Sequence, residues 1–196
     1  MVQAPKVPMK GLSTLLTLSK RYQISLAGIH STQDNPDLRF FFRGRYHMTL
    51  ERVYRPAFYL AMHYKSMPTF IKDNHQVWVE VFEFAQKAID NCVLLIPNYW
   101  YQFRHEWIWN VLRASFACAV HILGAVLYQI EASRDPNTWQ VRIPPNWAAL
   151  VRLSIRTLRH WSSAESTDLV LMRSVLERMY QGTCRLANVR PDVHLI

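Results

Sequence analysis

Residues 107–127 read WIWNVLRASFACAVHILGAVL, and this stretch decides the fold. After Arg113 it carries no Asp, Glu, Lys or Arg, and the next such residue is Glu131. Bulky apolar side chains would fall on every face of a helix here, which is typical of a helix surrounded by protein. The small residues between them would let neighbouring backbones approach closely. The stretch therefore predicts a buried central helix from about residue 105 to residue 130.

The composition favours helices throughout. At 196 residues, half of them hydrophobic, the chain is long enough to enclose one sizeable core. Glycine is scarce, and the alternation of Val, Ile and Thr that is typical of strands is nearly absent. We predict an all-α fold, a single-domain bundle of about six to eight helices around the central one. It would occupy residues 11–190, after a flexible lead at residues 1–10.

The uncharged run is a poor membrane span. It covers residues 114–130, slightly short of the ~20 apolar residues that a span needs. It also contains Ser115, His121 and Gln129. We therefore expect no membrane span. The first ten residues, MVQAPKVPMK, lack the apolar core of a secretory signal, so we expect an intracellular protein, cytoplasmic or nuclear.

The net charge leaves several classes of binding partner possible, and the cysteines indicate a cellular compartment. The net charge is +9, and 17 of the 23 basic residues are Arg, which is compatible with nucleic acid, an anionic ligand or acidic partners. Arg152, Arg156 and Arg159 would form one helical stripe, which a solvated surface explains equally well. We do not expect direct DNA binding. The three cysteines are widely spaced, with no CxxC pair, and we expect buried free thiols of a reducing compartment.

The sequence lacks the usual motifs of metal and cofactor chemistry. His105-Glu106 is not followed by the second His that an HExxH site requires, and there is no Asp-rich run to hold magnesium. A GxSxG nucleophile motif and a Gly-rich phosphate loop are also missing. We predict no metal and no cofactor.

His121 is the most informative single residue. It lies in the apolar helix with no charged residue within seven positions on either side. A buried neutral imidazole must form a hydrogen bond. Two interpretations stay open: a core histidine satisfied by a backbone carbonyl or a Tyr, or a donor or base that faces a pocket.

An apolar pocket is predicted where three helices meet. These are the central helix, the helix that contains Trp78, and a helix interrupted at Arg55-Pro56, where proline predicts a kink. Trp107 belongs to an aromatic cluster that either packs in the core or lines this pocket. The candidate ligand-binding residues are Trp78, Phe82, Trp107, Arg55 and Phe58. The candidate catalytic residues are His121 and Tyr46.

Three segments resemble a known family. Residues 38–63 contain Arg45-Tyr46-His47 and Arg55-Pro56-Ala57-Phe58-Tyr59, which resemble the "RYY…hRPFLy…lH" pattern of the fungal transcription factor regulatory domain. This is the middle homology region of zinc-cluster regulators. Residues 85–92, AQKAIDNC, resemble its "kCidaA" helix, and the apolar pattern from Trp107 to Leu176 resembles its C-terminal half. The resemblance covers about residues 37–181. It implies an all-helical bundle that binds effectors or partners, and it implies no catalytic residues.

The chain also departs from that family. A zinc cluster needs six cysteines, and only three are present. The basic linker and the coiled coil that should follow the cluster are missing too. Only the C-terminal part of the regulatory domain is matched, without the DNA-binding domain. The chain is therefore either a fragment or a stand-alone protein that kept the helical scaffold.

Two classes of function follow. In the first, a stand-alone helical domain binds an apolar fungal secondary metabolite, a terpenoid or polyketide, as a cyclase, pericyclase or isomerase of natural-product biosynthesis. Such a Diels–Alderase-like enzyme needs no cofactor, because holding a flexible substrate in its reactive conformation supplies much of the rate. In the second, the chain is a ligand-sensing or dimerising regulatory module of a fungal transcription factor, acting as a homodimer or through a partner. The sequence does not decide whether the ligand is turned over.

Overall fold

A computed structural model describes residue 17 and residues 36–67, 72–98, 108–133, 139–162 and 167–189. Within these ranges it contains no strand, so the all-α prediction is confirmed there, but it has five α-helices rather than six to eight. The helices are α2 (Pro36–Met62), η2 (Tyr64–Ser66, a 3-10 helix), α4 (His75–Asn98), α5 (Ile108–Ala132), α6 (Trp147–Ser162) and α7 (Thr167–Leu186). A further helix, which we predict to begin at Ser13, falls outside the described residues apart from Thr17.

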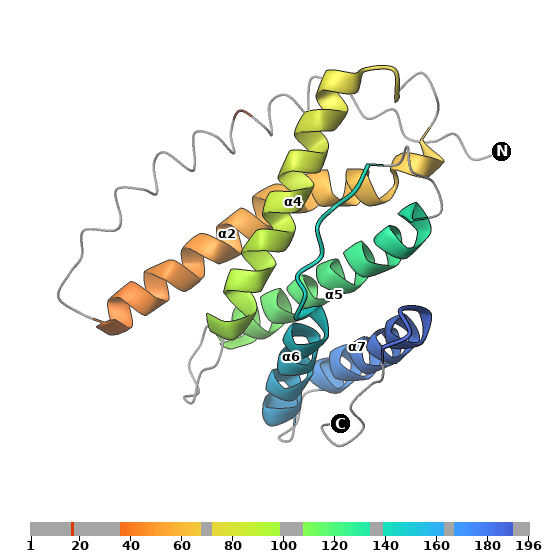
Figure 1. Cartoon of the computed structure of the whole chain (residues 1–196). Helices are drawn as coiled ribbons and strands as arrows, with labels where there is room; N and C mark the ends of the chain where they lie inside the picture. The colour runs from red at the N-terminus through yellow and green to blue at the C-terminus, as the bar shows by residue number, and fades with distance from the viewer. Residues whose placement is uncertain are drawn as a thin grey trace.

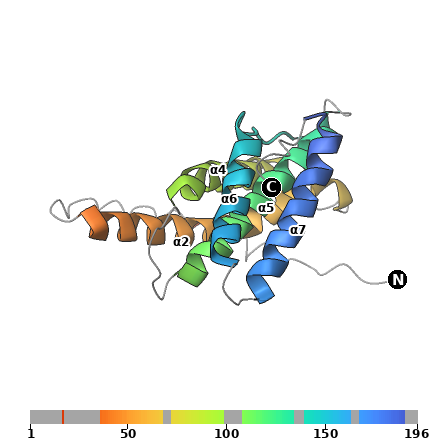
Figure 2. The same ribbon diagram turned by 90° about the horizontal axis from the view of Figure 1, so that it is seen from below.

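Helix α5 is the centre of the bundle, as predicted. It contacts α2 and α4 on one side and α6 and α7 on the other (Figure 1). Within the described residues it is the one helix long and apolar enough to cross a membrane, but 67% of its most apolar window is buried by the other helices. This is the burial expected of a core helix. Figure 2 shows that the first turns of α2 extend beyond the other labelled helices.

Small residues on α5 allow its neighbours to come close. Ala114, Ser115, Cys118 and Ala119 are all buried where α5 meets α4, α6 and α7. The Ser115 hydroxyl donates a hydrogen bond of 3.0 Å to the Ser154 hydroxyl on α6. Because the side chains are short, α5 and α6 can pack closely. The hydrogen bond between Ser115 and Ser154 leaves neither buried hydroxyl without a partner.

The interior consists of two apolar clusters that meet along α5. The first lies between α4, α5, α6 and α7 and includes Cys92, Cys118 and Leu158. The second lies between α2, α4 and the last turns of α5 and includes Phe58 and Phe82. Buried polar groups between α2, α4 and α5, such as Glu51 and Asn91, therefore lie next to apolar surface.

The helix ends test the local predictions. The sequence predicts that Asp73 or Asn74 caps the helix that contains Trp78. In the structure Asn74 is the cap of α4, since the Val77 N–H donates to Asn74 Oδ1 at 3.3 Å. Helix α2 continues through Pro56 to Met62, so proline does not end it. Pro97 lies one residue before the end of α4.

Gly182 is a residue at which the sequence allows the last helix to end or fray, but α7 continues through it. The helix continues to Leu186 and stops because Asn188 adopts a left-handed conformation, with φ of 53°. The Val189 N–H then reaches the Cys184 carbonyl at 2.9 Å and the Asn188 N–H reaches the Arg185 carbonyl at 3.4 Å. This is a Schellman motif, which asparagine can form without glycine.

Residues 139–146, which we call the strap, connect α5 to α6 along α4. The Trp139 ring stacks on Phe82, with ring centroids 5.3 Å apart and planes at 13°. The Tyr128 hydroxyl donates to the Trp139 carbonyl at 2.9 Å, and the Arg142 N–H donates to Gln86 Oε1 at 2.7 Å. The sequence predicts a loop over residues 131–146. In the structure these contacts hold the strap in place, and α5 itself continues to Ala132.

The predicted basic stripe on α6 is used in part to hold α7. Arg152 donates to the Tyr180 hydroxyl at 3.1 Å, and Arg159 lies 3.4 Å from the Glu177 carboxylate. Arg173, four residues before Glu177, lies 3.6 Å from the same oxygen, as its spacing predicts. Two of the three stripe arginines therefore have structural partners.

Candidate functional site

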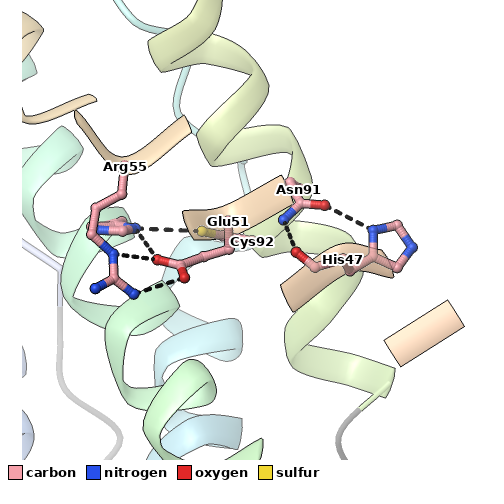
Figure 3. Close-up of polar contacts among 6 residues, drawn as sticks. His47, Glu51, Arg55, Asn91 and Cys92 are labelled. Carbon is pink, nitrogen blue, oxygen red and sulfur yellow. Dashed lines mark hydrogen bonds and ion pairs between the residues drawn. The ribbon is translucent and has the colours of Figure 1, made fainter. Parts of the chain in front are cut away.

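A buried carboxylate on α2 is the starting point of the site. Glu51 lies on the apolar face of α2, beside Leu50 and Tyr54, and its side chain is only 2% exposed. Arg55, one turn later, donates from Nε to Oε1 at 2.9 Å and from Nη2 to Oε2 at 2.7 Å (Figure 3). This two-bond geometry fixes the carboxylate plane. The Glu51 hydrogen bond also raises the pKa of Arg55 above its ordinary value.

His121 on α5 faces this carboxylate. Its Nδ1 lies 3.6 Å from Glu51 Oε1 and 3.9 Å from Cys92 Sγ, and its ring packs on Phe58 with centroids 4.8 Å apart. The side chain is 11% exposed. In the part of the chain that the structure describes, Nε2 forms no hydrogen bond. His121 Nδ1 therefore lies next to a carboxylate and a thiol. The first interpretation of the sequence, in which a backbone carbonyl or a tyrosine satisfies a core histidine, does not describe these partners.

Two thiols complete the buried cluster. Cys92 on α4 and Cys118 on α5 are both 0% exposed and are joined by a side-chain hydrogen bond. That bond, together with the hydrogen bond to His121, outweighs burial and lowers the pKa of Cys92 to about 7. Burial, aided by the neighbouring Cys92, raises the pKa of Cys118 well above its ordinary value. One thiol of the pair is therefore ionised far more readily than the other.

A second polar pair holds α2 against α4 next to the cluster. The His47 ring Nδ1 lies 2.8 Å from Asn91 Oδ1, and Asn91 Nδ2 donates to the His47 carbonyl at 2.9 Å (Figure 3). Both side chains are buried. Because His47 is one turn before Glu51 and Asn91 adjoins Cys92, this brace fixes the position of the carboxylate relative to the thiol.

The structure brings only part of the predicted site together. Arg55 and His121 both contact Glu51, and Phe58 packs on the His121 ring. The half-exposed Arg55 places its charge at the edge of the cluster.

The remaining predicted residues lie elsewhere. Trp78 and Phe82 are on α4, about 21 and 15 Å along the helix axis from Cys92. They belong to the aromatic cluster around the strap, packed with Tyr64, Tyr128 and Trp139. Tyr46 packs edge-on against His47, with ring centroids 5.2 Å apart, and does not contact His121 in the described region. Trp107 lies outside the described residues.

Sequence reasoning missed Glu51, Cys92 and Cys118. A signal for Glu51 was present, because it shares a helical face with Leu50, Tyr54 and Phe58 and precedes Arg55 by one turn. Cys118 also lies three residues before His121, on the same face of α5. No local pattern could have placed Cys92 there, because its partners are on other helices.

The comparisons with known proteins do not assign a family. No family model matches the chain, and no curated protein or solved structure matches it either. The resemblance to the fungal regulatory domain therefore stays a prediction. Among the described residues, no group of three or more His, Cys, Asp and Glu side chains is arranged to hold a metal ion.

The arrangement is suited to moving protons. A carboxylate near Nδ1 favours the tautomer that carries its proton there. The other nitrogen, Nε2, is then free to accept a proton from a ligand or return one. Phe58 supplies an apolar surface beside the ring, where electrostatic effects are stronger than in water.

Proposed function

We propose that this chain binds an apolar small molecule where α2, α4 and α5 meet and isomerises or cyclises it without a metal or cofactor. His121 acts as the acid–base group, and Glu51 orients it. The ligand class that we infer is a terpenoid or polyketide of fungal secondary metabolism with a carbonyl group. The observation that carries this proposal is the 3.6 Å contact between Glu51 Oε1 and His121 Nδ1, with Glu51 fixed by Arg55.

The proposed reaction balances without an oxidant. His121 Nε2 takes a proton from a carbon next to the carbonyl, and the resulting imidazolium, stabilised by Glu51, returns it to another carbon of the same conjugated system. The substrate and product are isomers of equal mass. A base of this kind contributes roughly 10²–10⁴-fold to the rate. In a cyclisation, the protonated ring of His121 would donate its Nε2–H to the carbonyl and polarise it, while the apolar walls hold the substrate chain folded.

The test uses the intact protein and an extract of the organism that encodes it, in deuterated water. Mass spectrometry would follow metabolites that disappear, isomers that appear, and deuterium gained at exchangeable carbon positions. We expect the wild type to form an isomer or to catalyse exchange, and heat-denatured protein to do neither. His121→Gln should lose at least roughly 10²-fold of this rate.

A matched histidine provides the control. His160 is exposed on α6, so His160→Gln changes the same residue type away from the cluster. We expect this variant to keep the wild-type rate. If a metabolite is retained but neither converted nor exchanged, the chain is a ligand-sensing module rather than an enzyme. If His121→Gln converts as fast as wild type, the acid–base role is wrong.

A further inference from the structure

The two buried thiols face each other across a helix interface. Cys92 is on α4 and Cys118 is on α5, and these two helices pack directly against each other. Packed helix axes are typically ~8–10 Å apart, and Cα atoms lie ~2.3 Å from each axis, so facing Cα atoms are roughly 3.5–5.5 Å apart. A disulfide accepts Cα separations of about 4.4–6.8 Å. The side-chain hydrogen bond between the two thiols agrees with this close approach of the helices at Cys92 and Cys118.

The surroundings of this pair differ from those of the third cysteine. Cys92 Sγ lies 3.9 Å from His121 Nδ1, which accepts the thiol proton when the ring carries its own proton on Nε2, the opposite tautomer to the one used in the metabolite reaction. Cys184 on α7 is equally buried at 0% exposure, but its neighbour is the Tyr180 hydroxyl, and burial raises its pKa. Cys184 is therefore a matched internal control for a buried thiol without a base.

We propose that Cys92 and Cys118 form a redox-active dithiol, which a hydroperoxide converts into a disulfide that joins α4 to α5. Cys92 is the attacking thiol and Cys118 is the resolving thiol. This site does not depend on the function proposed for His121 with a metabolite, because it requires only the two thiols and a nearby base.

The chemistry takes place in two balanced steps. In the first, the Cys92 proton passes to His121, and the sulfur attacks the terminal oxygen of the hydroperoxide. The O–O bond breaks, Cys92 becomes a sulfenic acid, and the leaving alkoxide takes the proton back and departs as an alcohol. In the second, Cys118 sulfur attacks the Cys92 sulfur, the S–O bond breaks, and the hydroxyl leaves as water with the Cys118 proton. Two thiols are oxidised by two electrons, and the peroxide is reduced to an alcohol and water.

The order of attack follows from the two thiols' environments. The thiolate is the reactive form of cysteine, and the pKa of Cys92 is near 7, whereas that of Cys118 lies well above its ordinary value. His121, at 11% exposure, is more exposed than either thiol, so a small peroxide would approach past its ring. Because both sulfurs are fully buried, the reaction will be slower than at an exposed thiol of the same pKa.

The experiment uses the whole folded chain with hydrogen peroxide as the probe. Samples are quenched at intervals, free thiols are alkylated, and peptides are mapped by mass spectrometry. We expect a peptide pair linked through Cys92 and Cys118, lighter than the two thiols by two hydrogen atoms, while Cys184 remains alkylated. A thiol reductant should reverse the link. The rate should rise as the pH increases through about 7, where Cys92 ionises.

Three variants separate the roles. Cys118→Ser should stop at the sulfenic acid of Cys92, which a dione reagent traps. Cys92→Ser should leave Cys118 unoxidised over the same period. Cys184→Ser should form the disulfide at the wild-type rate. If a variant fails to fold, the peptide map of the wild-type chain still gives the answer.

Several results would overturn the proposal. One is oxidation of Cys184 as fast as that of Cys92 in the folded chain. Another is a 92–118 link that forms only in denaturant, which would mean that the native helices hold the thiols too far apart or out of reach. Trapping of Cys118 rather than Cys92 would reverse the assigned roles. Loss of metabolite turnover has no bearing on any of these readouts, so the two proposals fail separately.

Discussion

Arg55 holds Glu51 with two hydrogen bonds of 2.9 and 2.7 Å, although the Glu51 side chain is 2% exposed and the Arg55 side chain is 50% exposed. The two partners therefore differ in their alternatives. The buried Glu51 carboxylate needs the Arg55 guanidinium as a hydrogen-bond partner, whereas the half-exposed guanidinium can instead form hydrogen bonds with water. A buried charge that loses its partner is costly, and a surface charge that loses its partner is not.

This inequality predicts different costs for the two single substitutions. Arg55→Met leaves the Glu51 carboxylate buried without its main partner and should lower the free energy of unfolding by about 3 kcal/mol. Glu51→Gln should cost about 1 kcal/mol, because Arg55 can hydrate. The double variant should be more stable than Arg55→Met alone. Urea unfolding of the four proteins measures this, and equal losses in the two single variants would show that the pair is not asymmetric.

The Tyr128 hydroxyl gives a prediction at alkaline pH. Burial raises the pKa of Tyr128 from the ordinary 10.0 to about 12, so this phenol stays neutral in the folded chain where it would ionise in the unfolded chain. Its contribution to stability is complete below pH 10 and is lost as the pH rises towards 12. Tyr128→Phe should therefore be less stable at neutral pH, by about 1 kcal/mol for the lost bond to Trp139.

The measurement is a pair of denaturation curves at increasing pH. The difference in unfolding free energy between wild type and Tyr128→Phe should shrink above pH 10 as the wild type loses its advantage. Other titrating groups affect both proteins alike and cancel in the difference. A gap that stays constant to pH 12 would contradict the burial of this phenol.

Asn188 at the end of α7 predicts a backbone effect. Its φ of 53° is unfavourable for a residue with a β-carbon and no local polar group, so Asn188→Ala should destabilise the chain by about 1 kcal/mol. Asn188→Gly adopts the same conformation freely and is the matched control, with a change within a few tenths of a kcal/mol. Thermal or urea midpoints distinguish the two. Equal stability of the Ala and Gly variants would argue against the Schellman motif.

At Gly182 we expect a substitution to stabilise the chain, in contrast to Asn188→Ala. It lies inside α7, and a β-carbon placed there would meet no heavy atom within 4 Å. Gly182→Ala should therefore stabilise the chain by about 0.5–1 kcal/mol through helix propensity alone. At Gly124 in α5 the new carbon would lie 3.7 Å from Phe58 Cζ, an ordinary contact, so Gly124→Ala should also be tolerated. A destabilised Gly182→Ala variant would mean that α7 does not continue through this position.

Some of the fold could be predicted from local patterns. The apolar run after Arg113 indicated the central helix, and Asn74 was one of two expected caps for α4, because both depend on residues close together in the sequence. The end of α7 could not be located from the sequence. Glycine is a common stop signal, but the helix continues through Gly182, and Asn188 supplies the left-handed residue instead.

The candidate site shows where sequence reasoning reaches its limit. His121 was identified from the sequence as a histidine in an uncharged helix, but its partners were not. Trp78 and Phe82 were grouped with it because they lie on one of the three helices predicted to line the pocket, yet they are about four and three helical turns away from Cys92, which is the residue of that helix near His121. The sequence pattern of a helix shows which side chains lie on the same side of its axis. It does not show which of those side chains come next to a given residue of another helix.

By itself, therefore, the sequence determined that the chain is helical, which stretch is buried at its centre, and which residues point inward, since these follow from periodicity along one helix. Only the tertiary structure decided that Glu51, Cys92, Cys118 and His121 come together. These residues belong to three helices, and Glu51 and His121 are 70 positions apart. The crossing and relative shift of packed helices depend on how their side chains interlock along the whole interface, which no single segment encodes.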